Sequence, residues 1–155
     1  MSINERYQTL LNGAESVRLG VAVALINEYG SILLELRSDV EMWGVTGGRL
    51  DPGETPAECA IREIYEETGV ELSSDKLFLS DVYGSPSDGR ILQYPDNRVH
   101  LIDILYVARI SSCSTLHLSH ESLALEFFPA SQIPTQLVPP AVRPIRDLIS
   151  SNVIT

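Results

Sequence analysis

Apolar residues early in the chain form two runs, RLGVAVALI at 18–26 and SILLELR at 31–37, and the residues between them are NEYG. Aliphatic and β-branched runs of this length that meet at a glycine-containing turn predict two adjacent β-strands. The segment WGVTGG at 43–48 predicts a short strand that runs into a glycine turn. Further strands are expected at 76–84, 99–110 and 122–129.

The last expected strand has an alternating pattern. Leu123, Leu125 and Phe127 fall at every second position, which predicts that they share one face of the strand. Proline-rich turns then lead to AVRPIRDLISS, which predicts a closing helix with Pro144 near its start. Strands interspersed with helices indicate a sandwich of the α/β or α+β class.

The length of the chain indicates one domain. Its 155 residues are enough to bury a core, and no repeat or linker-like break divides residues 1–155. Residues 1–17 are expected to form an N-terminal extension with a short helix at 3–11.

A second helix is predicted with defined ends. Thr55-Pro56-Ala57-Glu58 is a capping box with proline at the first helical position. Gly69 can end the helix in the left-handed conformation. At about 100° per residue, one face of the helix is expected to dock on the sheet. This face consists of Ala57, Ala60, Ile61, Ile64 and Thr68.

The same helix concentrates negative charge. Glu63, Glu66 and Glu67 stand at i, i+3 and i+4, so their carboxylates converge on a stripe beside the apolar face. Each like-charge neighbour costs about a few tenths of a kcal/mol, and acids in the last turns also oppose the helix dipole. Arg62 offsets part of this cost through i, i+4 pairs with Glu58 and Glu66, but one arginine cannot neutralise the set.

Two interpretations of the acidic stripe stay open. A run of glutamates is often a solvated helix face. The alternative is a site for a hard divalent cation such as Mg²⁺ or Mn²⁺, which prefers oxygen ligands and keeps several waters. Three carboxylates on one stripe meet this preference, a glycine turn ahead of the helix offers a backbone carbonyl, and Glu54 could add a fourth carboxylate.

Composition excludes several classes of function. The formal net charge is −10, and a sequence pI near 4.6 argues against general binding to nucleic acid or to an anionic membrane. The longest apolar run, VAVALI at 21–26, is too short to cross a bilayer, and the polar N-terminus does not look like a signal peptide. Cys59 and Cys113 fit no metal spacing, so two reduced thiols in a cytoplasmic protein are expected.

The acidic segment resembles a known motif. Gly48, five residues, Glu54, seven residues, Arg62-Glu63-Ile64, one residue, Glu66-Glu67, one residue and Gly69-Val70 match the Nudix box at every defined position. The looser resemblance outside the box covers most of residues 18–150. One departure is that Val45-Thr46-Gly47-Gly48 stands where many relatives have Leu-Pro-Gly-Gly.

The resemblance implies an α/β/α sandwich around a central mixed sheet, with the box helix packed on that sheet. It also implies hydrolysis of a nucleoside diphosphate linked to another group, with one to three Mg²⁺ or Mn²⁺ ions and a nucleotide as the partner. A homodimer is compatible with it. By motif position, the expected metal ligands are Glu63, Glu66, Glu67 and the carbonyl of Gly48, with Glu54 in support and Arg62 holding the acids in place.

The general base is left open between the box and a later segment. In the box, Glu63 is the candidate. Outside it, Glu121 before the last strand is ranked ahead of Glu126 within that strand, because a loop can reach over a site. For both later glutamates, a surface carboxylate is an equally good interpretation.

Evidence on the substrate is thinner. Relatives that cleave ADP-ribose often carry a proline about 16 residues beyond the box, where this chain has Pro86. The leading interpretation is therefore an ADP-ribose or nucleotide-sugar pyrophosphatase. The alternatives are a MutT-like (d)NTP pyrophosphohydrolase and a non-catalytic, nucleotide-binding regulatory domain, although such a domain usually lacks box glutamates. Candidate contacts to base or phosphate are Arg37, Trp43, Tyr83, Arg90, Tyr94 and Arg98.

Overall fold

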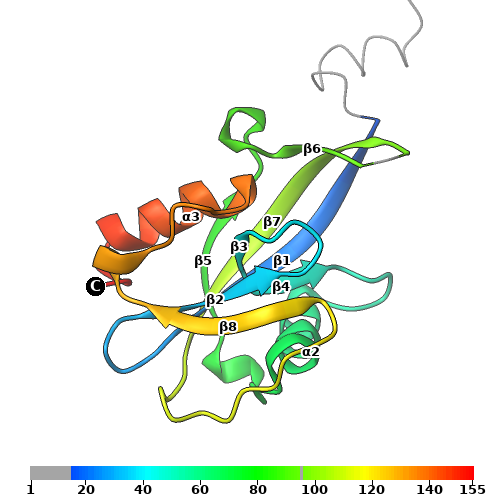
Figure 1. Ribbon diagram of the computed structural model, residues 1–155. Helices are drawn as coiled ribbons and strands as arrows, with labels where there is room; N and C mark the ends of the chain where they lie inside the picture. Colours follow the sequence, from blue (N-terminus) through cyan, green and yellow to red (C-terminus); the bar gives the residue numbers. More distant parts are fainter. Residues whose placement is uncertain (1–14, 95) are drawn as a thin grey trace, which may run out of the picture.

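The computed structural model describes residues 15–94 and 96–155, so the helix predicted at 3–11 lies outside the described residues. In the described part, eight strands form one mixed sheet, and two α-helices lie on its opposite faces (Figure 1). The strands are β1 (Ser16–Ile26), β2 (Ile32–Arg37), β3 (Trp43–Val45), β4 (Gly47–Arg49), β5 (Phe78–Tyr83), β6 (Ile91–Gln93), β7 (Arg98–Arg109) and β8 (Ser122–Phe128). The helices are α2 (Pro56–Thr68) and α3 (Pro139–Ser150).

The sheet has the order β3-β2-β1-β7-β5, with β8 paired to β2, β6 to β7 and β4 to β1. The long central strands β1 and β7 are parallel, and the other neighbours are antiparallel. β1 pairs with β2 at a single position, Ile26 opposite Ile32, and then diverges from it. The short strand β4 pairs with β1 at Gly20–Ala22, where β2 has moved away. This divergence lies beside the middle and last turn of α2, because Gly48 of β4 adjoins Glu63 and Gly47 bonds to Glu67.

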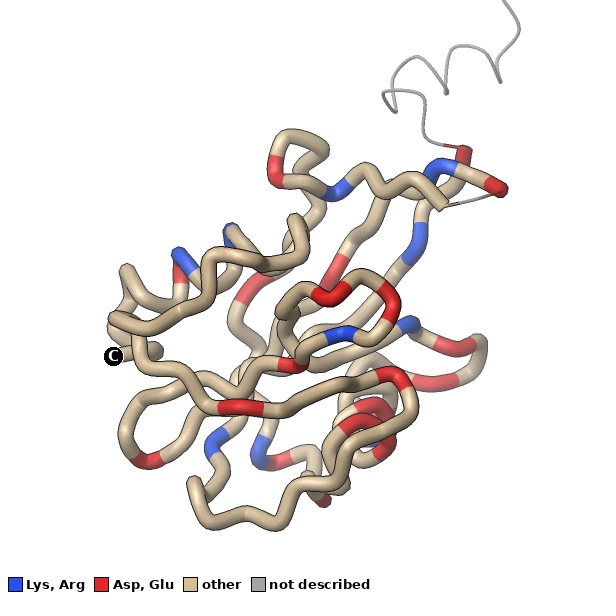
Figure 2. The backbone as a smooth tube through the Cα atoms, viewed as in Figure 1, with Lys and Arg blue, Asp and Glu red and all other residues tan. Residues whose placement is uncertain are grey.

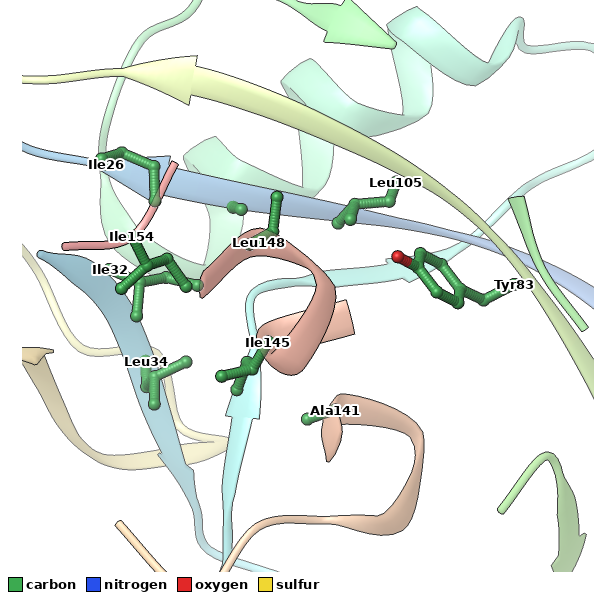
Figure 3. Close-up of a cluster of buried hydrophobic side chains, with 10 residues drawn as sticks. Ile26, Ile32, Leu34, Tyr83, Leu105, Ala141, Ile145, Leu148 and Ile154 are labelled. Atoms are coloured by element: carbon green, nitrogen blue, oxygen red, sulfur yellow. The ribbon is translucent and has the colours of Figure 1, made fainter. Parts of the chain in front are cut away.

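Alternation along β1 explains why its apolar run is continuous. Val21 and Val23 pack with α2 on one face, whereas Ala24 and Ile26 pack with α3 on the other. A strand covered on both faces has no position that needs a polar side chain. On the α3 side, Ile145 and Leu148 of the helix point toward the strands, as Figure 3 shows. The predicted α/β/α sandwich with a central mixed sheet is confirmed.

Some local predictions are wrong. The predicted glycine turn after β3 is itself strand β4, because its backbone pairs with β1. Leu123 is 50% exposed and does not share the buried face of Leu125 and Phe127. The closing helix begins at Pro139, so Pro144 lies inside it and not near its start. The three-residue strand β6 was not predicted, because ILQ is too short to show a period.

Candidate active site

The ends of α2 are built as the capping pattern predicted. The Thr55 hydroxyl accepts a hydrogen bond from the Glu58 N–H at 3.1 Å, and the Glu58 carboxylate accepts one from the Thr55 N–H at 2.9 Å. Gly69 closes the helix with φ of 76°, and its N–H donates to the Tyr65 carbonyl. These caps determine the length of α2, and the burial of its apolar face against the sheet determines its rotation. Ala60 and Ile64 are fully buried against the sheet, and the carboxylates lie beside them.

Glu67 is the buried member of the acidic stripe, with 7% exposure. Its Oε2 accepts a hydrogen bond from the Gly47 N–H at 2.9 Å. Burial raises the pKa of Glu67 to about 9, and repulsion from Glu35, Glu63 and Glu121 adds to the effect. A carboxylate in this environment is costly to ionise unless a cation lies beside it.

Glu63 lies against the backbone of the strand that precedes α2. A Cβ added to Gly48 would come within 2.2 Å of the Glu63 carboxylate carbon, so the missing side chain makes room for this carboxylate. Arg62 Nη1 donates to Glu63 Oε1 at 2.8 Å. Burial raises the pKa of Glu63, and the bond from Arg62 opposes that rise.

Arg62 connects the acids of this region. Its guanidinium lies 2.6 Å from Glu54, 2.8 Å from Glu63, 3.3 Å from Glu66 and 3.4 Å from Asp51. The hydrogen bonds from Arg62 lower the pKa of Glu54 to about 2. The predicted pair with Glu66 is confirmed. The predicted pair with Glu58 is wrong, because the Glu58 carboxylate bonds to the helix cap instead.

One cleft of about 1020 Å³ collects the acidic stripe and several residues from other elements. Figure 2 shows acidic positions along α2 and near the start of β8. The cleft is lined at one end by Glu35, Arg37, Gly47, Gly48, Glu63, Glu66, Glu67 and Glu121. Its lining also includes Arg18, Gly20, Tyr83, Arg90, Tyr94, Leu101 and Asp103. This second end begins beside the first, because a Cβ at Gly20 would lie 3.1 Å from the Gly48 carbonyl oxygen.

Three predicted substrate contacts lie outside this lining. Trp43 packs edge-to-face on Phe128, with ring centroids 4.9 Å apart. Pro86 begins the short 3-10 helix at Pro86–Asp88, whose neighbour is α3. Arg98 is exposed and donates to Gln93. Arg37 does line the cleft, where it forms an exposed pair with Asp39 at 2.7 Å.

The two later glutamates occupy different places. Glu121 lines the cleft, and its charge contributes to raising the pKa values of Glu63 and Glu67. Glu126 is an exposed residue of β8 and is not part of the cleft lining. Of these two glutamates, Glu121 is therefore the one that lines the cleft.

Two acids of the cleft were missed by the sequence prediction. Glu35 is 6% exposed in β2, accepts a hydrogen bond from the Ser122 hydroxyl, and has a pKa raised by burial. Asp103 lies in β7 and pairs with Arg90 at 2.6 Å. Each is a single acid inside a run of apolar strand residues, LLELR or LIDIL. Acidic side chains are rarely buried, so an acid inside an apolar strand could have been recognised in the sequence as a candidate site residue.

The donor chemistry of the acidic end fits a hard divalent cation. It combines the buried carboxylate of Glu67 with Glu63, Glu66 and the backbone at Gly48, all of them oxygen donors. Within residues 15–94 and 96–155, no three His, Cys, Asp or Glu side chains form an assembled metal-binding group. Arg62 bonds to oxygens of both Glu63 and Glu66.

The α/β/α sandwich, with a helix that carries carboxylates at its cleft, is typical of a class of enzymes that cleave pyrophosphate bonds. The model of the NUDIX domain matches residues 17–148, so the chain belongs to the Nudix family and is a Nudix hydrolase. Among the described residues, no helix is long and apolar enough to cross a membrane.

Comparison with known proteins gives relatives of the same architecture. A Bacillus subtilis (strain 168) protein named "Putative 8-oxo-dGTP diphosphatase" is 31% identical over 128 residues, 83% of this chain and 77% of that protein. The MutT Nudix hydrolase structure from Burkholderia pseudomallei has a TM-score of 0.70 at 24% identity, covering 85% of this chain and 98% of that one. The Nudix domain of Shewanella oneidensis NrtR, solved with ADP-ribose, has a TM-score of 0.68 at 17% identity, covering 97% and 99%. These structures share the fold of this chain.

Proposed function

We propose that this Nudix hydrolase is a Mg²⁺- or Mn²⁺-dependent nucleoside triphosphate pyrophosphohydrolase that releases a nucleoside monophosphate and pyrophosphate. The observation that carries the proposal is one continuous cleft, which joins the acidic end at α2 to a second end lined by Tyr83, Tyr94 and Leu101. A phosphate chain fits the first end and a base fits the second. The name of the Bacillus subtilis relative supports a nucleoside triphosphate substrate.

In this proposal, Glu63, Glu66, Glu67 and the Gly48 carbonyl hold one to three divalent ions. Such ions, when bound, neutralise phosphate charge and lower the pKa of a coordinated water. Arg37 lines the cleft, and its guanidinium binds the terminal phosphate of the substrate. It gives up its ion pair with Asp39 to do so, and this exposed pair contributes little net stability.

The remaining steps belong to side chains of the chain itself. Glu121 accepts the proton of the water that attacks phosphorus, because its carboxylate lines the cleft without belonging to α2. Arg62 holds Glu54 and the acids of α2, so that the carboxylates keep their positions in the absence of substrate.

ADP-ribose and nucleotide sugars, the leading substrates expected from the sequence, have weaker support. That interpretation depended on Pro86, which is not among the residues lining the cleft. A non-catalytic domain is also disfavoured, because Glu63, Glu66 and Glu67 are all present and together at the cleft.

The test is a substrate panel with Mg²⁺ and with Mn²⁺. It includes the (d)NTPs, 8-oxo-dGTP, ADP-ribose, nucleotide sugars and dinucleoside polyphosphates, with products separated by anion-exchange chromatography. The expected result is a monophosphate and pyrophosphate from triphosphates, lost in Glu67→Gln. Preferential formation of AMP and ribose 5-phosphate from ADP-ribose would overturn the proposal in favour of the first interpretation.

A further inference from the structure

Asp103 is an acid on the sheet floor of the cleft, in β7. Its side chain is 16% exposed and lies over Gly20 of the neighbouring strand β1. A Cβ at Gly20 would come within 2.5 Å of Asp103 Oδ1, so glycine at position 20 leaves the room that this carboxylate occupies. A larger residue at position 20 would therefore displace the Asp103 carboxylate.

Arg90 holds the Asp103 carboxylate in place. It is 1% exposed, and its Nη1 donates to Asp103 Oδ2 at 2.6 Å while its Nη2 donates to the Pro140 carbonyl at 2.8 Å. That carbonyl is free because Pro144, four residues later in α3, has no N–H to donate to it. The guanidinium also lies 5.6 Å from the ring centroid of Tyr83. One buried arginine therefore ties Asp103 to α3 and β5.

The hydrogen-bonding capacity of Asp103 is mostly unused. An ionised carboxylate offers about four acceptor positions, and Arg90 is the sole hydrogen-bond donor to it among the described residues. Oδ1 accepts no bond there. An unfilled acceptor in a poorly hydrated place is unfavourable, and a buried ion pair contributes little net stability. Both arguments point to a ligand that brings its own donors.

The surroundings of Asp103 select the kind of ligand. Near it the cleft is lined by Leu101, Leu105 and the ring of Tyr83, which offer apolar surface. The charges beside this surface are Arg90 and Arg18, and the Arg18 guanidinium lies 4.8 Å from the ring centroid of Tyr94. A flat heteroaromatic ring satisfies this surface, whereas sugar hydroxyls would lose their hydration against it. Among the common nucleobases, guanine presents two adjacent N–H donors on one edge, N1–H and the 2-amino group. Adenine would direct the N1 lone pair toward the carboxylate.

We propose that Asp103 binds the N1–H and 2-amino edge of a guanine base and makes the enzyme selective for guanine nucleotides. This inference rests on the proposed triphosphate hydrolysis, because it concerns the base of the same substrate. Arg90 and Gly20 are positioning residues that hold the carboxylate in place.

The test removes one donor from the ligand and leaves the protein intact. Inosine triphosphate differs from GTP by the 2-amino group alone, so its kcat/KM is expected to be about 10- to 100-fold lower, with the difference in KM. ATP is expected to fall at or below ITP. In Asp103→Asn the ratio of GTP to ITP should fall close to one. A ratio measured within one variant does not depend on how much of that variant is folded.

Controls separate this inference from the proposed function. Asp81→Asn, an exposed acid of β5, should keep the wild-type ratio. Equal kcat/KM for GTP, ITP and ATP would overturn the inference and leave the hydrolase proposal standing. If no triphosphate is hydrolysed, the proposed function fails, but calorimetry with GMP and IMP still tests the site, and equal affinities would overturn the inference.

The ribose diol is the competing source of two adjacent donors. If Asp103→Asn abolishes discrimination between GTP and 2′,3′-dideoxy-GTP and leaves the GTP to ITP ratio unchanged, Asp103 binds the ribose and the inference is overturned.

Discussion

Arg62 binds both carboxylate oxygens of Glu54, with Nη2 2.6 Å from Oε1 and Nε 3.1 Å from Oε2. The two residues are eight positions apart, so this pair connects the loop before α2 to the middle of the helix. The same guanidinium reaches Glu63 and Glu66. The repulsion expected within the acidic stripe is therefore offset by one planar cation that several acids share.

Replacing Arg62 should loosen this region. In Arg62→Met the acids lose their shared partner, and the free energy of unfolding is expected to fall by about 1–3 kcal/mol. Arg62→Lys should recover a minor part, because an ammonium cannot reproduce the planar fork. Urea unfolding without divalent ions measures the change. Arg146→Met, at an exposed position of α3, should stay within about 0.5 kcal/mol of wild type. An equal loss of stability in both variants would contradict the conclusion that Arg62 stabilises the acids of α2.

Glu67→Gln should make the protein more stable and less active. Burial and neighbouring acids disfavour the charged form of Glu67, so without metal a neutral amide at this position is expected to raise the free energy of unfolding at pH 7 by about 1–3 kcal/mol. Turnover should fall by about 100-fold or more, because a ligand is lost. Unfolding and initial rates on the same preparation test both effects. Near-normal Mg²⁺-dependent turnover would exclude Glu67 from the metal site.

Divalent ions should stabilise the wild-type fold. At about 100 times its dissociation constant, Mg²⁺ adds about 2.7 kcal/mol, or roughly 5–10 °C in Tm for a chain of this size. In Glu67→Gln the shift should be small. Calorimetric scans after chelator treatment measure it, with NaCl of matched ionic strength as the control. An unchanged Tm at millimolar Mg²⁺ and Mn²⁺ would contradict a metal site at α2.

The sequence was most informative where the signal is local. The capping residues Thr55 and Gly69 determine the ends of α2, and the spacing of the box places its carboxylates on one stripe, so both could be predicted. Contacts between distant segments could not. Nothing local indicates that Asp103 pairs with Arg90, because that pair depends on how β7 and the segment before β6 come together in the sheet.

Predictions for substrate contacts outside the box were less reliable for the same reason. Trp43 was proposed for its residue type and Pro86 for its distance from the box. In the structure Trp43 packs against Phe128, and Pro86 belongs to a turn near α3. A buried acid such as Glu35 in an apolar strand is the stronger type of signal, since its burial needs a compensating partner.

Gly48→Ala should impair the site without unfolding the protein. The added methyl group meets the end of the Glu63 side chain, which can swing away, so stability is expected to change by less than about 1 kcal/mol. The displaced carboxylate should lower kcat by about 10-fold or more. Gly53→Ala is not a suitable control because Gly53 has φ of +90°. The exposed Ser80→Ala of β5 serves instead, and equal kinetics for both variants would rule out the contact with Glu63.

Glu121→Gln should identify the proton acceptor. Its carboxylate lines the cleft next to Glu63 and Glu67, whereas Glu126 of β8 does not. If Glu121 takes the proton of the attacking water, the amide should lower kcat by about 10²- to 10⁴-fold with little change in KM. Glu126→Gln should retain the wild-type kcat. If Glu121→Gln also keeps the wild-type kcat, Glu121 is not the proton acceptor, and Glu63 of the box helix becomes the candidate.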